Sequence, residues 1–235
     1  MREVIPSLNQ IKKELHMPAA NGWGPMTSLA PTQQYPPGIE LFKQESAPRD
    51  VYLIEDGLVK LTYVEQNARD FMVGLRTSGW TVGAASVILN RSHACTAMTL
   101  SACHLRRVSA EAFLHLLNTN HEFDLYFHRM QSHELYEQIT QLARLKCLSA
   151  RDKLEQLLSE LIPVLAPKAD ENKVRVKLPL KHREVAELIG VTPEHLSRVL
   201  REMQNEGLVS REKGWIKITD VRLLQRHHEI KESYA

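Results

Sequence analysis

A row of polar side chains lies in the segment VTPEHLSRVLREM, residues 191–203. The row consists of Glu194, Ser197, Arg198 and Arg201. Their steps of three and four residues place them on one face if the segment is a helix. Arginine can bind guanine O6 and N7 through two hydrogen bonds, glutamate can accept from cytosine N4, and serine can donate or accept. The chemistry that this row offers is the reading of base edges in DNA.

The residues around this segment predict two helices joined by a tight turn. The first helix is predicted in KHREVAELIG, where Ala186 is small enough for close helix approach and Gly190 permits the turn. Thr192 is a suitable N-cap for the second helix, with Pro193 at its first position. LVSREKGWIKIT then predicts a β-hairpin. Helix, turn, helix and hairpin in this order indicate a winged helix-turn-helix, and an unrelated helical hairpin is the alternative.

The N-terminal half has the pattern of a β domain. Between residues 39 and 108, short β-rich runs alternate with turns at 55–57 and 78–79, which is typical of a sandwich or roll. Residues 122–148 contain neither Pro nor Gly and predict one long helix with an apolar stripe. Such a stripe can pack against the β domain, against a second copy of itself, or both. Ser109 and Ser149 are the predicted N-caps of the helices that follow them.

The composition is that of a globular protein, with 43% hydrophobic and 25% charged residues and a net charge of +2. No apolar run reaches the roughly 20 residues that span a membrane, and the N-terminus lacks the apolar core of a signal peptide, so we expect no membrane partner and a cytoplasmic location. The three cysteines (Cys95, Cys103 and Cys147) form no metal-binding pair. No P-loop, nucleophile elbow or zinc signature is present, so we predict no catalytic residues and no enzyme activity.

The order of these segments, together with EVAELIGVTPEHLSRVLREMQNEGLV, resembles the Crp/Fnr family of bacterial transcription factors (cyclic-AMP receptor and fumarate–nitrate regulator) over residues 38–225. The resemblance implies an α+β fold: a cyclic-nucleotide-binding-like β-roll, a long dimerisation helix and a C-terminal winged helix-turn-helix. The predicted parts are an N-terminal helix with an irregular lead-in (1–37), the β-roll sensory domain (38–120), the dimerisation helix (121–148) and the DNA-binding domain (149–235).

The family also implies a homodimer paired through the long helix, double-stranded DNA as a partner, and RNA polymerase as the partner of an activator. The Glu-x-x-Ser-Arg pattern at residues 194–198 is similar to the fumarate–nitrate branch and implies inverted TTGAT-like half-sites about one helical turn apart. The cyclic-AMP branch, which prefers TGTGA-type sites, has Arg where this chain has Pro193. The predicted DNA-binding residues are Thr192, Glu194, Ser197, Arg198, Arg201 and Lys181, the last of which replaces the usual Thr or Ser cap and could reach a phosphate.

The effector site of the family corresponds to GAASVILNRSHACTA, residues 83–97. Members of the family that bind cyclic AMP have a Gly-Glu-Leu motif followed by an Arg-Ser-Ala motif at this site. In them the Glu holds the ribose hydroxyl and the Arg pairs with the cyclic phosphate. Here Ala84 replaces the Glu. Either His93 or Arg91 stands at the Arg position depending on the alignment, and the register of the following strand favours His93. Ribose hydroxyls without that carboxylate lose their partner, so we do not expect cyclic AMP to be the effector. The pocket candidates are Gly83, Ala84, Ala85, Ser86, Arg91, Ser92, His93 and Gln138.

Several alternatives for the effector stay open. Three cysteines cannot ligate an iron–sulfur cluster of four thiolates, so we expect none. Haem could be ligated by His93, Cys95 or Met98, or these could be ordinary strand residues. A redox switch at Cys147 and a regulator without an effector are further alternatives. The histidines form no set with metal-ligand spacing, so no metal site is predicted.

Overall fold

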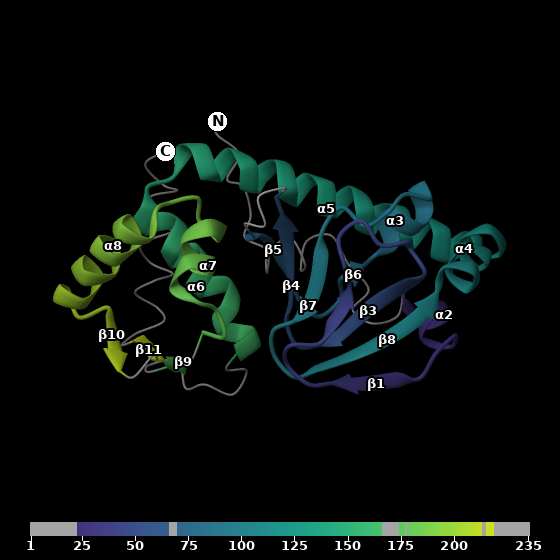
Figure 1. Cartoon of the computed structure of the whole chain (residues 1–235), viewed down its shortest axis with the longest axis horizontal. Coiled ribbons are helices and arrows are strands. Elements are labelled where there is room, and N and C mark those ends of the chain that lie inside the picture. The colour runs from purple at the N-terminus through teal and green to yellow at the C-terminus, as the bar shows by residue number, and fades with distance from the viewer. Residues whose placement is uncertain (1–22, 66–69, 166–173, 177, 213–214, 219–235) are drawn as a thin grey trace. The chain divides into compact units, whose positions relative to one another are not determined.

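The structure is a computed structural model of the 235-residue chain. It describes residues 23–65, 70–165, 174–176, 178–212 and 215–218 (Figure 1). The chain divides between Thr140 and Gln141 into two compact units, which we describe separately. The helices predicted at about 7–15 and after Asp220, and the turn at Lys213–Gly214, lie outside the described residues.

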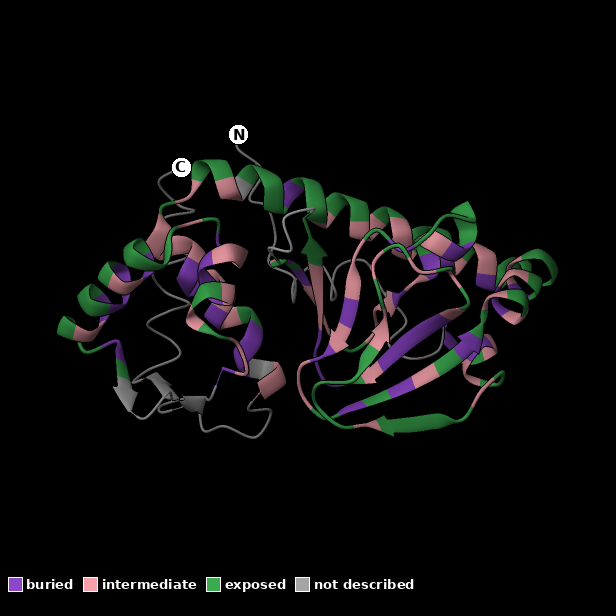
Figure 2. Cartoon of the chain, viewed as in Figure 1, coloured by how far each residue is buried: buried purple, intermediate pink, exposed green. Residues whose placement is uncertain are grey.

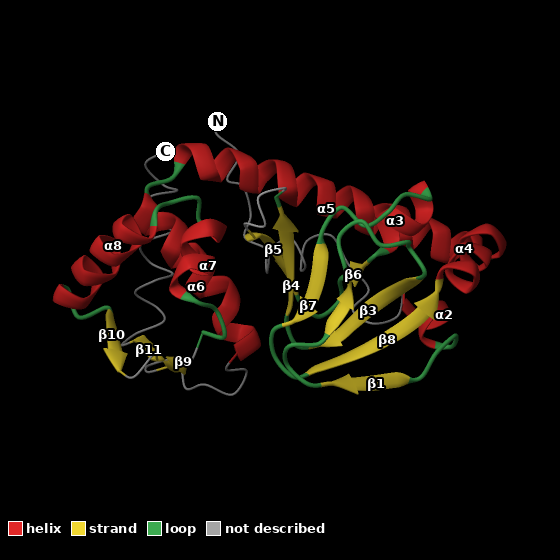
Figure 3. Cartoon of the chain, in the orientation of Figure 1, coloured by secondary structure: helices red, strands yellow, loops and turns green. Residues whose placement is uncertain are grey.

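Two antiparallel sheets form the first unit, and each has four strands among the described residues (Figure 3). One sheet has the order β1-β8-β3-β6, formed by Thr32–Tyr35, Cys103–Ser109, Asp50–Asp56 and Thr81–Val82. The other has the order β2-β7-β4-β5, formed by Glu40–Phe42, Thr96–Thr99, Val59–Val64 and Asp70–Arg76. The predicted β-roll is therefore confirmed. The prediction of an irregular segment up to residue 37 is wrong for residues 32–35, because β1 pairs with β8 from Thr32↔Arg106 to Tyr35↔Cys103.

The strands predicted on either side of the turns at 55–57 and 78–79 are present, but they do not pair with each other. Instead β3 pairs with β8 and β6, while β4 pairs with β5 and β7. The first turn therefore crosses from one sheet to the other. Gly57 makes this crossing possible, because it has a φ of +98° and a Cβ there would lie 2.5 Å from the carbonyl oxygen of Ala102.

An aromatic cluster joins the β-roll to the helices of the first unit. Phe113 of α4 (Ala110–Thr119) and Phe123 and Phe127 of α5 (His121–Cys147) are buried together with Trp23, which precedes the short helix α2 (Gly24–Thr27). Their ring centroids lie 5.2–6.5 Å apart. Ser109 caps α4 as predicted, since its hydroxyl accepts from the Ala112 N–H at 3.2 Å. Helix α3 (Ala84–Leu89) occupies part of the region where the effector pocket was predicted.

Helix α5 confirms the predicted long helix to within one residue at each end. Its buried apolar residues, Phe123 and Phe127, lie in its first turns; further along, an apolar row remains exposed in the single chain (Figure 2). Leu135, Ile139 and Leu142 are 59%, 60% and 57% exposed and follow one another at steps of four and three. Among the described residues, no helix is both long and apolar enough to cross a membrane.

The second unit contains three helices and a small sheet among the described residues. Helix α6 (Ala150–Leu165) begins after Ser149, whose hydroxyl accepts from the Asp152 N–H at 3.2 Å as the predicted cap. Helices α7 (His182–Leu188) and α8 (Pro193–Asn205) follow. The antiparallel sheet has the order β10-β11-β9, formed by Val209–Glu212, Trp215–Ile218 and Val174–Val176. This is the predicted winged helix-turn-helix, and the α+β fold class is confirmed.

Candidate functional site

The turn between α7 and α8 is built as its sequence predicts. Gly190 has a φ of +65°, which glycine adopts without strain, and a Cβ there would lie 3.3 Å from Leu145 Cδ2. The Thr192 hydroxyl accepts from the His195 N–H at 3.2 Å and so caps α8, while Pro193 occupies its first position. These interactions fix where α8 begins and therefore which side chains lie at its N-terminal end.

The apolar face of α8 is completely covered. Leu196 and Met203 have no exposed surface, Val199 and Leu200 are buried, and Val185, Ala186 and Ile189 of the α7 region belong to the same interior. Burying a side chain of this size contributes about 1.5–3 kcal/mol. Since four such residues anchor the helix, its opposite face has a fixed orientation with respect to this unit.

That opposite face carries the predicted DNA-binding row. Glu194, Arg198 and Arg201 are exposed, whereas Ser197 is half-buried. Neither arginine has a hydrogen-bond or ion-pair partner within the part of the chain that the structure describes. The Ser197 hydroxyl lies 3.3 Å from Nε2 of His182, the first residue of α7. This contact has no signal in the spacing of either helix, because it joins residues 15 positions apart through side chains alone.

The carboxylate of Glu194 lies at the positive end of α8. Its own backbone N–H and the Thr192 hydroxyl donate to it and hold the pKa of Glu194 below its usual range, with a smaller contribution from the charge of His182. Glu194 is therefore ionised at neutral pH and acts only as an acceptor. Lys181 is exposed at the N-cap of α7, and its backbone N–H donates to Glu184 Oε2 at 2.7 Å. The Glu184 carboxylate thus supplies the half of a capping box that binds the N-cap N–H, while Lys181 offers no side-chain acceptor to the N–H groups of the first turn.

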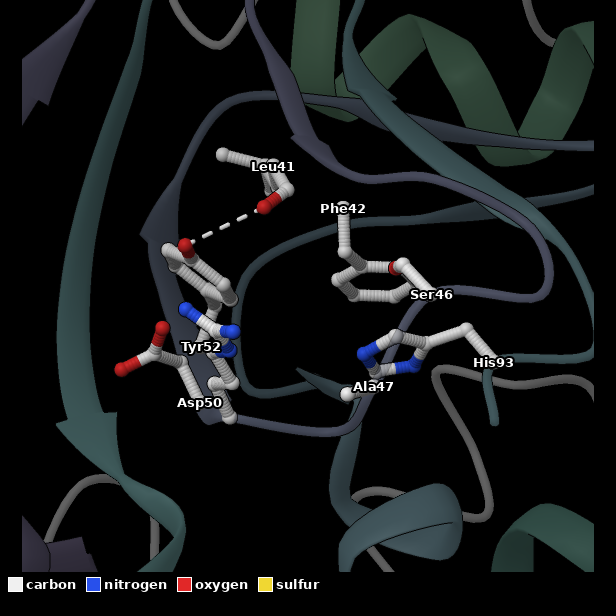
Figure 4. A pocket seen from close by; sticks show the side chains of 8 residues that line it. Leu41, Phe42, Ser46, Ala47, Asp50, Tyr52 and His93 are labelled. Carbon is white, nitrogen blue, oxygen red and sulfur yellow. Dashed lines mark hydrogen bonds between the residues drawn. The ribbon is translucent and has the colours of Figure 1, made fainter. Parts of the chain in front are cut away.

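A pocket of about 260 Å³ opens in the first unit (Figure 4). Tyr52 lies on one side of it and the rings of Phe42 and His93 on the other. The lining residues are Leu41, Phe42, Ser46, Ala47, Arg49, Asp50, Tyr52 and His93. The Tyr52 hydroxyl donates to the carbonyl oxygen of Leu41 at 3.2 Å. The volume is slightly below the roughly 300–1000 Å³ of most small-molecule sites.

Only His93 of the predicted pocket residues lines this pocket. Its ring stacks on Phe42 with the centroids 3.8 Å apart and the planes at 13°. Both rings pack against Gly83, where a Cβ would lie 3.4 Å from Phe42 Cε1 and 3.5 Å from His93 Cε1. Burial lowers the pKa of His93, so its imidazole is neutral at pH 7.

The other predicted pocket residues have different surroundings. Ala84, the first residue of α3, is buried. Gly83 and Ser86 are half-buried, and the other candidates of this segment are exposed, namely Ala85, Arg91 and Ser92. Gln138 is exposed on α5 and donates to Glu134 Oε1 at 3.3 Å. Sequence reasoning missed Phe42 and Tyr52, because they belong to β2 and β3 and have the ordinary pattern of buried strand residues.

The cysteine and metal candidates can be located as well. Burial raises the thiol pKa of Cys95 and of Cys103, and the latter thiol donates to the carbonyl oxygens of Leu58 and Ser101 at 3.3 Å each. Cys147 is exposed. Within the described ranges, no three His, Cys, Asp or Glu side chains are grouped so that they could hold a metal ion.

Comparison with known proteins gives two matches to family models. The model of the cyclic nucleotide-binding domain matches residues 32–120, and that of the Crp-like helix-turn-helix domain matches residues 152–227. The CRP-like protein Clp of Xanthomonas campestris pv. campestris is 25% identical over 183 residues, which cover 75% of this chain and 79% of that protein. Potassium channel AKT1 of Oryza sativa is 33% identical over 95 residues. This matched segment is 40% of this chain, and it spans only 10% of the channel's length.

Solved structures share the fold over most of the chain. A CRP/FNR-family transcriptional regulator from Thermus thermophilus superposes with a TM-score of 0.70 at 22% identity, covering 84% of this chain and 98% of the other. For FixK2 from Bradyrhizobium japonicum the TM-score is 0.69 at 19% identity, with 84% and 96% covered. For CLP from Xanthomonas campestris the TM-score is 0.66 at 21% identity, with 85% of this chain and 98% of CLP covered.

The two family models follow one another along the chain in the order of the two structural units. The exposed polar face of α8 is what a helix-turn-helix needs to enter the major groove. The chain therefore belongs to the Crp/Fnr family and is a DNA-binding transcription regulator with a cyclic nucleotide-binding domain.

Proposed function

We propose that α8 reads inverted TTGAT-like half-sites through Glu194, Ser197 and Arg198. The observation that carries this proposal is the exposure of Glu194 and Arg198 at the N-terminal end of a helix whose opposite face is buried. Thr192 and Arg201 position the helix on the sugar–phosphate backbone of the DNA, and Lys181 contacts a phosphate of the DNA. Pro193 at the position where the cyclic-AMP branch has arginine favours TTGAT over TGTGA.

The regulator acts as a homodimer through α5. Support comes from the exposed row of Leu135, Ile139 and Leu142, whose steps of four and three give the seven-residue period of a coiled-coil seam. Two copies of α8 related by a twofold axis would meet two inverted half-sites, which is the arrangement that the half-site proposal needs. As an activator it would also contact RNA polymerase, and it would act in the cytoplasm, where its DNA is.

The effector, in this proposal, is not cyclic AMP. The ribose of that nucleotide needs a carboxylate, and Ala84 offers a buried methyl group instead. His93, at the position of the phosphate-binding arginine, is a neutral ring stacked on Phe42. The residues present therefore do not fit the cyclic AMP of the family. CLP from Xanthomonas campestris is described as responsive to c-di-GMP, so that dinucleotide belongs among the ligands to be tested.

A regulator without an effector is the second candidate. It is favoured by the packing of Phe42 and His93 against Gly83, and by the small volume of the pocket beside Tyr52. A haem- or redox-responsive regulator is the third. Its ligands would be His93, Cys95 or Met98, and His93 would have to leave Phe42 to bind iron.

Two measurements test this function. Selection of bound duplexes from a random pool is expected to recover inverted TTGAT-like half-sites; recovery of TGTGA-like sites would contradict the half-site proposal. An absorbance spectrum and native mass of the purified protein are expected to give a dimer without haem absorption. Thermal melting with cyclic AMP, cyclic GMP and c-di-GMP then separates the effector candidates: stabilisation by cyclic AMP would contradict its exclusion, and no shift with any ligand favours a regulator without an effector.

A further inference from the structure

The first helix of the motif contributes a side chain to the reading face of the second. Ser197 is the half-buried member of the predicted row, and its Oγ lies 3.3 Å from His182 Nε2. His182 is the first residue of α7 and follows the N-cap Lys181, whose N–H donates to Glu184. The start of α7 therefore places an imidazole beside the one hydroxyl of the row.

This contact restricts what Ser197 can offer a base. A hydroxyl has one proton to donate and two lone pairs that accept. If His182 Nε2 has no proton, the Ser197 hydroxyl donates to it, and only its lone pairs are left for the amino groups of adenine or cytosine. If Nε2 carries a proton, the hydroxyl accepts from it and keeps its own proton for thymine O4, guanine O6 or a purine N7.

The charge of the same imidazole also acts on Glu194. Its charge is among the causes that lower the pKa of that carboxyl, after the hydrogen bonds from the Glu194 backbone and Thr192. A single α7 side chain thus acts on two of the three residues that the proposed function assigns to base edges, on Ser197 by contact and on Glu194 by charge.

We propose that His182 is a positioning residue for base recognition: it fixes the orientation of the Ser197 hydroxyl and so selects the class of base that Ser197 contacts. This inference rests on the proposed function, in which Ser197 reads a base edge. It goes further by assigning specificity to α7, which the half-site proposal does not require.

The experiment measures affinity for a set of duplexes in which each base pair of one half-site is replaced in turn. Ser197→Ala first identifies the base pair that Ser197 reads, as the position where discrimination is lost. His182→Leu is then expected to lose discrimination at that position by roughly fivefold, which is one hydrogen bond, with no change at the other positions. The double variant should lose no more than Ser197→Ala alone, because His182 acts on the base only through the Ser197 hydroxyl.

Two further variants separate positioning from a general structural effect. His182→Gln can still hydrogen-bond the hydroxyl and is expected to keep most of the discrimination, also if the Leu variant does not fold. Arg183→Gln changes the neighbouring residue, which pairs with Glu187 of its own helix at 2.8 Å, and should leave the discrimination unchanged at every position.

The inference is overturned if His182→Leu keeps full discrimination at the position that Ser197 reads. Where the Leu variant does not fold, it is overturned if a folded His182→Gln variant loses that discrimination. It is also overturned if Ser197→Ala changes discrimination nowhere. The proposed function fails separately, if the unaltered protein prefers no half-site sequence at all.

Discussion

The guanidinium of Arg151 binds the carboxylate of Glu206 through two hydrogen bonds, each of 2.6 Å. Glu206 is the C-cap of α8, and Arg151 lies in the first turn of α6. The Arg151 Nε also donates to Glu155, which is buried, at 2.8 Å. These contacts, the one to Glu206 first, raise the pKa of Arg151, so the cation is permanent. One end of α8 is thus held by an ion-pair network and the other by the Thr192 cap.

Removing Arg151 should destabilise the second unit. Arg151→Ala leaves the buried Glu155 carboxylate without its partner, so we expect a loss of about 2 kcal/mol in the free energy of unfolding, less than for a fully buried pair because Glu206 is half exposed. Urea unfolding measures it. Arg183→Ala is the matched control, since its pair with Glu187 is more exposed and should contribute at most about 0.5 kcal/mol. Equal losses for both variants would contradict this account of the network.

The two exposed arginines of α8 should differ in what they contribute to DNA binding. Arg198→Ala removes a base contact, so we expect a loss of about 1–3 kcal/mol in binding and relaxed preference at one base pair. Arg201→Ala removes a backbone contact and should weaken all sequences alike while reducing the dependence of affinity on salt by about one counterion. Fluorescence anisotropy over a salt series separates the two. The assignment is wrong if Arg201→Ala is the variant that changes base preference.

Charge on the exposed row of α5 should separate the two copies. In Ile139→Glu, each copy would place a carboxylate in an apolar seam, and we expect mostly monomer at low micromolar concentration by sedimentation velocity. Val73→Glu is the control, because Val73 is equally exposed but lies on strand β5. A dimer that survives Ile139→Glu, or one that Val73→Glu dissociates, would exclude the α5 seam as the interface.

The stability of the β-roll should fall in mild acid because of His93. Burial depresses the pKa of this imidazole below its unfolded value of about 6.5, so the unfolded state takes up the proton first as the pH decreases. The stability that the neutral His93 contributes is therefore complete above pH 6.5, and it is lost as the pH falls toward the lower pKa of the folded state. Urea midpoints at pH 7.5 and 5.5 measure it, and His93→Gln should reduce the difference. If His93→Gln shows the same difference as the parent protein, His93 is not the titrating group.

The helices α4 to α8 could be predicted from sequence because their signals are local, whereas the short helices α2 and α3 were not predicted. Ser109, Ser149 and Thr192 act as the predicted caps, and the apolar face of α8 is buried residue by residue. The pairing of the strands could not be predicted, because β3 and β4 are neighbours in sequence but belong to different sheets.

The pocket and the His182–Ser197 contact were beyond sequence reasoning for a similar reason. Phe42 meets His93 across 51 residues, and no periodicity encodes a contact between side chains of separate segments. Strand β1 was missed because prolines surround it and its first three residues are exposed, so it lacks the alternation of a half-buried strand.

The most direct test of the central claim is the affinity of the purified protein for a duplex with an inverted TTGAT repeat and for a scrambled duplex of equal length and composition, at the same salt concentration. The account predicts a preference on the order of 10³-fold or more for the repeat, which Arg198→Ala reduces. Equal affinity for the two duplexes would contradict it.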